Sequence, residues 1–149
     1  MRMIFIRHGA KRSGEGDPQL TSAGRKMSYE LGKWLLSRGY LPKKAYRSST
    51  KRTEETLEEV MFACNTKLDV ISTEIPEFWD DWLNFLEGVS QSTNSDFIIA
   101  GHHPTVEMLI DKYNISIPPR NFASAIVLKK CSNRLWNYID SWQGRADLN

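Results

Sequence analysis

The stretch MIFIRHG, residues 3–9, decides the fold of the first part of the chain. Its four apolar residues in a row predict a short strand that is buried on both faces, as in the helix-covered sheets of α/β proteins. The apolar run stops at Arg7 and His8. Residues 10–19 contain glycine, proline and basic residues without any periodicity, so we expect a loop over the end of this strand.

The same pattern returns late in the chain. Residues 97–100, FIIA, form a second short apolar run, and Gly101, His102, His103 and Pro104 follow it. Ligands of open α/β sheets bind outside the carboxyl ends of the strands. We therefore expect His8 and His102 to lie above the same edge of one sheet.

The remaining segments predict alternating strands and helices. Apolar spacing and cap residues predict helices from Thr21 to Gly39, after the Ser48-Ser49-Thr50 cap, over 78–86 and over 105–113, and strands at 45–48, 68–71, 125–128 and 135–139, with a polar linker at 90–95. This order predicts an α/β three-layer sandwich, with a mostly parallel central sheet flanked by helices and an antiparallel edge from the last strand pair. A length of 149 residues predicts a single domain over 1–149.

Composition excludes several classes of protein. A net charge of +2 is too balanced for a basic nucleic-acid-binding protein, and no window approaches the roughly 20 apolar residues of a membrane span. The N-terminal apolar run is far shorter than that of a signal peptide, so we expect a cytoplasmic protein. Cys64 and Cys131 lack the spacing of a metal site, which predicts reduced, buried thiols, no metal and no cofactor.

The basic residues at the predicted strand ends indicate phosphoryl chemistry. Arg52 stands at the start of the helix after the second strand, so Arg7, Arg52, His8 and His102 can form one cationic pocket. Two guanidinium groups can bind phosphoryl oxygens, while one imidazole attacks phosphorus and the other stabilises the developing charge. Taken alone, Arg52 would be a salt-bridge partner of Glu55 or Glu59, and His103 a bystander.

The chain resembles the histidine phosphatase superfamily, also called phosphoglycerate-mutase-like, and within it the short phosphohistidine phosphatases of the bacterial SixA type. The resemblance covers nearly the whole chain and rests on four segments: IRHG at 6–9, DPQLTSAG at 17–24, SSTKRTEET at 48–56 and IAGHHP at 99–104.

This resemblance implies a role for each residue of the pocket. His8 would be the nucleophile that becomes phosphorylated, and Arg7, Arg52 and His102 would line the phosphate pocket. Gly9 and Gly101 are expected to let the backbone approach the phosphate.

Glu74 would be the acid that protonates the leaving group. Asp17 and Glu77 are the alternatives for this acid, and each of the three carboxylates is otherwise an ordinary solvated surface group.

The resemblance implies a metal-independent phosphatase that removes phosphate from a phosphohistidine on another protein. Members that act on sugar phosphates have extra segments over the site, whereas only residues 66–96 are available here, so we expect a shallow, open site. The alternatives are a phosphatase for small phosphate esters and a phosphate-binding module without turnover. Side chains that could guide or dock a partner are Lys11, Arg12, Lys51 and Arg120, together with the aromatic Phe78, Trp79 and Trp82.

Overall fold

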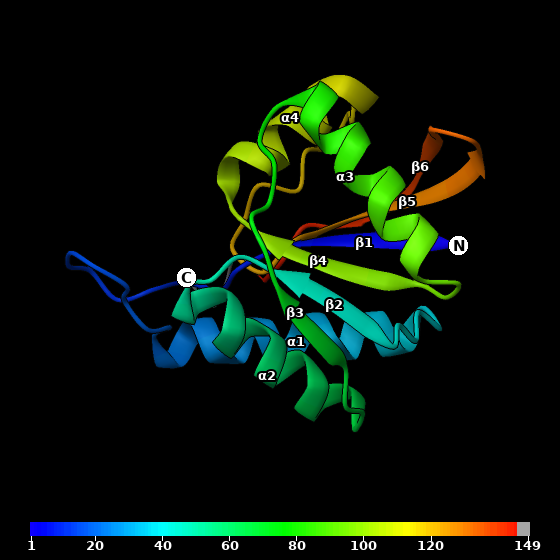
Figure 1. Ribbon diagram of the computed structural model, residues 1–149. Coiled ribbons are helices and arrows are strands. Elements are labelled where there is room, and N and C mark those ends of the chain that lie inside the picture. The colour runs from blue at the N-terminus through cyan, green and yellow to red at the C-terminus, as the bar shows by residue number, and fades with distance from the viewer. Residues whose placement is uncertain (146–149) are drawn as a thin grey trace.

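Within residues 1–145, which the computed structural model describes, a six-stranded sheet crosses the middle of the molecule in the order β3-β2-β4-β1-β5-β6 (Figure 1). The strands are β1 (Arg2–Arg7), β2 (Lys44–Arg47), β3 (Asp69–Ser72), β4 (Phe97–Gly101), β5 (Ala125–Ser132) and β6 (Leu135–Trp142). The pairs β2–β3, β2–β4 and β1–β4 are parallel, while β5 runs antiparallel to β1 and β6. The predicted mostly parallel sheet with an antiparallel edge is confirmed.

Four helices in the same part of the chain cover the two faces of the sheet, as Figure 1 shows. They are α1 (Ser22–Ser37), α2 (Lys51–Cys64), α3 (Trp79–Ser92) and α4 (His103–Tyr113). Helices α1 and α2 pack on one face through a core that includes Leu31, Leu57 and Val60. Helices α3 and α4 pack on the other face through Trp82 and Leu109. The predicted three-layer sandwich is therefore confirmed.

Side chains of β1 divide between these two cores because successive residues of a strand point to opposite faces of the sheet. Ile4 and Ile6 belong to the core under α1 and α2, and Met3 and Phe5 to the core under α3 and α4. All four are at most 1% exposed. The continuous apolar run at the start of the chain thus has the burial that its sequence predicts.

Helix α3 is longer than its sequence suggested, because the predicted linker at 90–95 begins inside the helix. The hydroxyl groups of Ser90 and Ser92 donate to the carbonyls of Glu87 and Val89, at 3.0 Å in both cases. Val89 and Ser90 are buried against the rest of the molecule. Packing and these local hydrogen bonds keep the serines helical, although serine usually favours helix ends.

Two further expectations were wrong. Helix α4 begins at His103, two residues early, because a proline is tolerated in the first turn, where its missing N–H has no helical acceptor. Cys131 is exposed near the end of β5, while Cys64 is half-buried and its thiol donates to the Gly32 carbonyl at 3.2 Å. Only one of the two thiols is therefore partly buried as predicted.

Gly9 and Gly24 allow the loop after β1 to lie directly on α1. A side chain at Gly9 would overlap the Gly24 carbonyl and the Ser28 hydroxyl, and one at Gly24 would overlap the backbone of Ala10. A side chain at Gly101 would meet the ring of Phe5 at 3.1 Å. Close packing within the protein therefore requires glycine at positions 9 and 24.

We expect Gly24→Ala to lower the free energy of unfolding by roughly 1–3 kcal/mol, the usual cost of overpacking. The matched control is Gly88→Ala in α3, where an added methyl group meets no atom within 4 Å. That change should leave the stability unchanged or raise it by up to about 1 kcal/mol, because alanine favours helix. Denaturant unfolding of the two variants measures both effects, and equal stabilities would contradict the packing described here.

Candidate active site

The pairing of β1 with β4 brings two histidines together at one edge of the sheet. Arg7 stands opposite Gly101 in the ladder, and the backbone N–H of His8 donates to the Gly101 carbonyl at 3.2 Å. Beyond this point the His8 and His102 rings lie with their centroids 5.3 Å apart. The structure thus brings together the two residues that end the apolar runs of the sequence.

His8 is buried and electrically neutral. Its side chain lies 5% exposed, and its Nδ1 atom is 2.7 Å from the Gly9 carbonyl oxygen. The pKa of His8 is lowered to about 3, mainly by burial and also by the nearby His102, Arg52 and Arg7, while the hydrogen bond with the Gly9 carbonyl acts in the opposite direction. A carbonyl only accepts hydrogen bonds, so Nδ1 carries the proton and Nε2 carries the lone pair.

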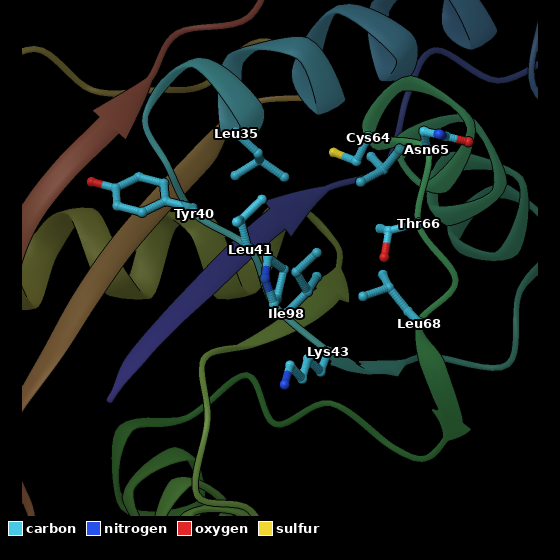
Figure 2. Close-up of a pocket in the computed structure, with 11 residues that line it drawn as sticks. Leu35, Tyr40, Leu41, Lys43, Cys64, Asn65, Thr66, Leu68 and Ile98 are labelled. Atoms are coloured by element: carbon cyan, nitrogen blue, oxygen red, sulfur yellow. The ribbon is translucent and has the colours of Figure 1, made fainter.

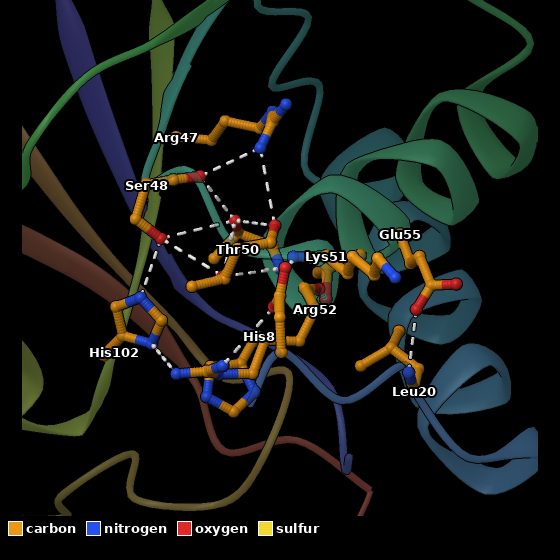
Figure 3. Close-up of polar contacts among 12 residues, drawn as sticks. His8, Leu20, Arg47, Ser48, Thr50, Lys51, Arg52, Glu55 and His102 are labelled. Carbon is orange, nitrogen blue, oxygen red and sulfur yellow. Dashed lines mark hydrogen bonds and ion pairs between the residues drawn. The ribbon is translucent and has the colours of Figure 1, made fainter. Parts of the chain in front are cut away.

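His102 lies between a hydroxyl group and a guanidinium group, as Figure 3 shows. Its Nε2 atom is 2.7 Å from the Ser48 hydroxyl, and its Nδ1 atom is 3.4 Å from Nη2 of Arg52. Burial, together with Arg52 and Arg7, lowers the pKa of His102 to about 4. Both imidazoles are therefore neutral near pH 7.

The two arginines reach the site from different elements. Arg7 ends β1, its guanidinium lies 4.3 Å from the centre of the Phe122 ring, and its Nη1 donates to the Arg120 carbonyl at 2.6 Å. Arg52 lies in the first turn of α2, which Thr50 caps. Burial lowers the pKa of Arg7.

In the described part of the chain, the buried Nε atoms of Arg7 and Arg52 have no hydrogen-bond partner. Buried donors without a partner cost free energy, and an anion bound between these groups would remove that cost. The arrangement is suited to a phosphoryl group.

The acid candidates are not equivalent in the structure. Glu74 is exposed between β3 and α3 and lines an open hollow of about 450 Å³ together with Ser48. Asp17 accepts a hydrogen bond from the Lys51 backbone at 2.9 Å and lies 4.0 Å from Nη1 of Arg52. This carboxylate therefore pairs with donors at the start of α2. Glu77 is exposed in the same segment as Glu74.

Arg52 does not form the ion pairs with Glu55 or Glu59 that its helical spacing would allow. Arg25 of α1 takes both carboxylates instead, at 2.6 Å from Glu55 and 3.1 Å from Glu59. Glu55 also accepts from the Leu20 backbone at 2.8 Å. These contacts join α1 to α2 and leave Arg52 directed to His102.

Two residues that sequence reasoning did not assign to the site also support it. The Thr56 hydroxyl accepts from the Gly9 backbone at 2.9 Å and donates to the Arg52 carbonyl at 2.7 Å. Its place one helical turn after Arg52 was the available signal. The ring of Phe122 lies 5.8 Å from that of His8. No sequence pattern predicts this contact, because Phe122 belongs to an irregular loop before β5.

The residues predicted to guide or dock a partner differ in exposure and in their contacts. Arg120 is exposed but bonds Glu107 at 2.7 Å and 3.2 Å, and Glu107 also contacts His103 at 3.1 Å. Phe78 is exposed, whereas Trp82 is fully buried and unavailable for docking, and Trp79 is half-buried beside Tyr113. The other three basic residues predicted to guide a partner, Lys11, Arg12 and Lys51, are exposed.

A separate pocket of about 280 Å³ opens at the opposite ends of β2 and β4 (Figure 2). Its lining includes the apolar side chains of Leu35, Val60 and Ile98 together with Lys43 and Asn65. Leu35, Val60 and Ile98 are at most 1% exposed, whereas Leu41, which also lines the pocket, is 63% exposed. Its lining contains none of the residues predicted for phosphoryl chemistry.

Two searches of residues 1–145 bear on other kinds of site. No three histidine, cysteine, aspartate or glutamate side chains are grouped in a way that could hold a metal ion. None of the helices in this part of the chain has the length and apolar character to cross a membrane.

Comparison with known proteins places the fold. Over 95% of this chain and 96% of the other, it is similar to the protein histidine phosphatase SixA complexed with tungstate, with a TM-score of 0.79 and 17% identity. The SixA protein from Agrobacterium tumefaciens gives a TM-score of 0.74 with 20% identity, over 94% of this chain and 96% of that one. Phosphoglycerate mutase from Bacillus anthracis gives 0.71 with 13% identity, over 93% and 91% of the two chains.

These likenesses confirm the phosphoglycerate-mutase-like fold that the sequence predicted. None of the curated proteins gives a significant match. The model of the histidine phosphatase superfamily (branch 1) matches residues 3–82, which is more than half of the chain. The protein therefore belongs to the histidine phosphatase superfamily.

Proposed function

We propose that this protein is a metal-independent phosphatase that works through a phosphohistidine intermediate on His8. The observation that carries the proposal is the buried, neutral His8 imidazole, which lies beside His102 and close enough to Arg7 and Arg52 for their charges to lower its pKa. A neutral imidazole nitrogen with a free lone pair is a competent nucleophile toward phosphorus.

The first step transfers the phosphoryl group to His8. The Nε2 lone pair attacks phosphorus, a nitrogen–phosphorus bond forms, and the bond from phosphorus to the leaving group breaks. The leaving group departs with the electron pair and takes up a proton from Glu74 or from solvent. Arg7, Arg52 and His102 stabilise the phosphoryl oxygens, on which negative charge is spread in the transition state.

The second step returns the enzyme to its starting state. Water attacks the phosphorus of phospho-His8, an oxygen–phosphorus bond forms, and the electron pair of the breaking nitrogen–phosphorus bond returns to Nε2. Inorganic phosphate leaves, and the proton that the water loses is carried by the product or by solvent. Throughout both steps Nδ1 keeps its proton on the Gly9 carbonyl, so His8 leaves phosphorus as a neutral imidazole.

As substrate we propose a phosphohistidine presented by another protein. The hollow beside Ser48 is open, and its exposed Glu74 is not held by any contact that would fix it over a leaving group. An imidazole leaving group needs less help from an acid than a sugar alkoxide does. The likeness to SixA supports this substrate, and the likeness to phosphoglycerate mutase keeps small phosphate esters as the alternative.

We expect the protein to hydrolyse an aryl phosphate in the presence of a metal chelator, and His8→Ala to lower the rate at least about 1000-fold, because the nucleophile is lost. The control is His103→Ala, an exposed neighbour of His102 that should stay close to the parent rate. Alkaline quenching and mass spectrometry should find acid-labile phosphate on His8. Activity that needs a metal or survives His8→Ala would overturn the mechanism, and phosphate binding without turnover would indicate a binding module.

The substitution Glu74→Gln should affect the hydrolysis of phosphate esters and of phosphohistidine to different extents. With an alkyl phosphate, whose leaving group needs an acid, we expect kcat to fall roughly 100-fold. With a phosphohistidine protein the fall should be less than about threefold, for the reason given above. Glu77→Gln and Asp17→Asn test the alternative acids in the same two assays. A parent enzyme that prefers the sugar phosphate over phosphohistidine would contradict the proposed substrate.

The neutral state of His8 also predicts how stability depends on pH. The unfolded chain binds a proton at His8 as the pH falls below the ordinary value of 6.5, whereas the folded chain binds it only near its lowered pKa of about 3. Stability is therefore lost as the pH falls between these values. From pH 7 to 5 the parent should lose roughly 2 kcal/mol more than His8→Asn does in denaturant unfolding. Equal losses would show that His8 is not held neutral.

A further inference from the structure

A cluster of hydroxyl groups lies behind His102, where β2 passes into α2 (Figure 3). The Ser48 hydroxyl is 2.7 Å from Nε2 of His102, 3.3 Å from the Thr53 hydroxyl and 3.4 Å from the Thr50 hydroxyl. The Thr50 and Thr53 hydroxyls are 3.1 Å apart. The imidazole of His102 is thus connected through Ser48 to the start of α2.

Backbone carbonyls fix the direction of these hydrogen bonds. The Thr53 hydroxyl donates to the carbonyl of Ser48 at 2.8 Å or of Thr50 at 2.9 Å, and a carbonyl can only accept. The lone pairs of Thr53 are therefore free to accept from Ser48. Once Ser48 directs its own proton to a threonine hydroxyl, its lone pair faces Nε2 of His102 and accepts the Nε2 proton.

Arg52, on the other side of the ring, favours the same position of the proton on His102. Its Nη2 atom lies 3.4 Å from Nδ1 of His102, and a guanidinium group has only donors to offer. The Nδ1 atom must then carry the lone pair. The hydroxyl cluster and the Arg52 guanidinium group therefore favour the same tautomer of the neutral His102 ring, with the proton on Nε2 and the lone pair on Nδ1.

We infer that Ser48 is a positioning residue for His102, which fixes the ring so that Nδ1 faces Arg52 and the phosphate pocket. This inference rests on the proposed function for its catalytic meaning. With the Nε2 proton already placed on Ser48, the Nδ1 lone pair can accept a proton when a phosphoryl dianion binds. Both N–H groups of the resulting imidazolium are then satisfied, one by Ser48 and the other by a phosphoryl oxygen.

The surroundings explain why the ring needs this support. The groups that face His102 are His8 and Arg7 at the end of β1 and Arg52 on α2, and burial with the two arginines lowers the pKa of His102 to about 4. Without the Ser48 hydroxyl, the Nε2 proton of a half-buried imidazolium would have no acceptor. Its loss therefore disfavours the protonated ring.

Imidazole nitrogen spectra of the ¹⁵N-labelled protein test the ring state directly. The chain has three histidines, so the spectrum of His102→Gln assigns the His102 signals. In the parent we expect a neutral ring with the proton on Nε2. Ser48→Ala should give a mixture of the two neutral forms, whereas Ser48→Thr, which keeps a hydroxyl group, and Ser49→Ala, an exposed neighbour, should keep the parent pattern.

Kinetics with an aryl phosphate provide the second readout. Ser48→Ala should lower kcat about 10- to 100-fold, the factor for losing a hydrogen bond to a charged group. The alkaline limb of its pH–rate profile should move to lower pH, because the protonated form of His102 is then lost earlier. Ser48→Thr should recover most of the rate, and Ser49→Ala should match the parent.

A parent spectrum with the proton on Nδ1, or a Ser48→Ala variant with the parent's spectrum and pH profile, would overturn the inference. An inactive parent would contradict the proposed function, and the spectra would still decide the role of Ser48 in holding the ring.

Discussion

The parallel pairing of β1 with β4 is the contact on which the site depends. Its register sets Ile6 opposite Ala100 and Arg7 opposite Gly101, so that both strands deliver their next residue to the same edge of the sheet. A shift of one residue would turn the side chains of a strand to its other face. The buried apolar residues of β1 therefore fix the register for reasons of packing, and the positions of His8 and His102 follow from it.

The charged groups of the site have an electrostatic cost. Arg7 and Arg52 hold charge in a partly buried place, each with an Nε atom that lacks a partner in residues 1–145, and the two imidazoles stay neutral beside them. A carboxylate placed between the arginines would relieve this cost but would compete with phosphate. Asp17 instead lies 4.0 Å from Arg52 and bonds the backbone at the start of α2. The proposed phosphate site thus gives up stability for affinity toward an anion.

Much of the fold and the central residues of the site follow from local sequence. Two apolar runs are followed by Arg-His or by Gly-His. These runs predict both the buried strands and the residues at their ends, because side chains beyond the end of a strand are no longer covered by neighbouring strands. The contacts of Ser48, Thr56 and Phe122 could not be predicted in this way. They depend on how separate segments meet, as when the loop before β5 lays the Phe122 ring against His8. The wrong boundary of α3 has the same origin, since the burial of Val89 and Ser90 outweighs the local preference of serine.

The strand order also governs when the pocket can exist during synthesis. β1 pairs only with β4 and β5 in the sheet, and β2 pairs with β3 and β4, so the first 96 residues contain β1 without either of its ladder partners. The ribosome synthesises Arg7, His8 and Arg52 long before β4, the strand that joins β1 to β2. Contacts between residues so distant in sequence slow folding, and the apolar strand β1 stays without a pairing strand until β4 has been synthesised. The proposed phosphate pocket therefore needs residues 97–101, which lie between β1 and β2 in the sheet.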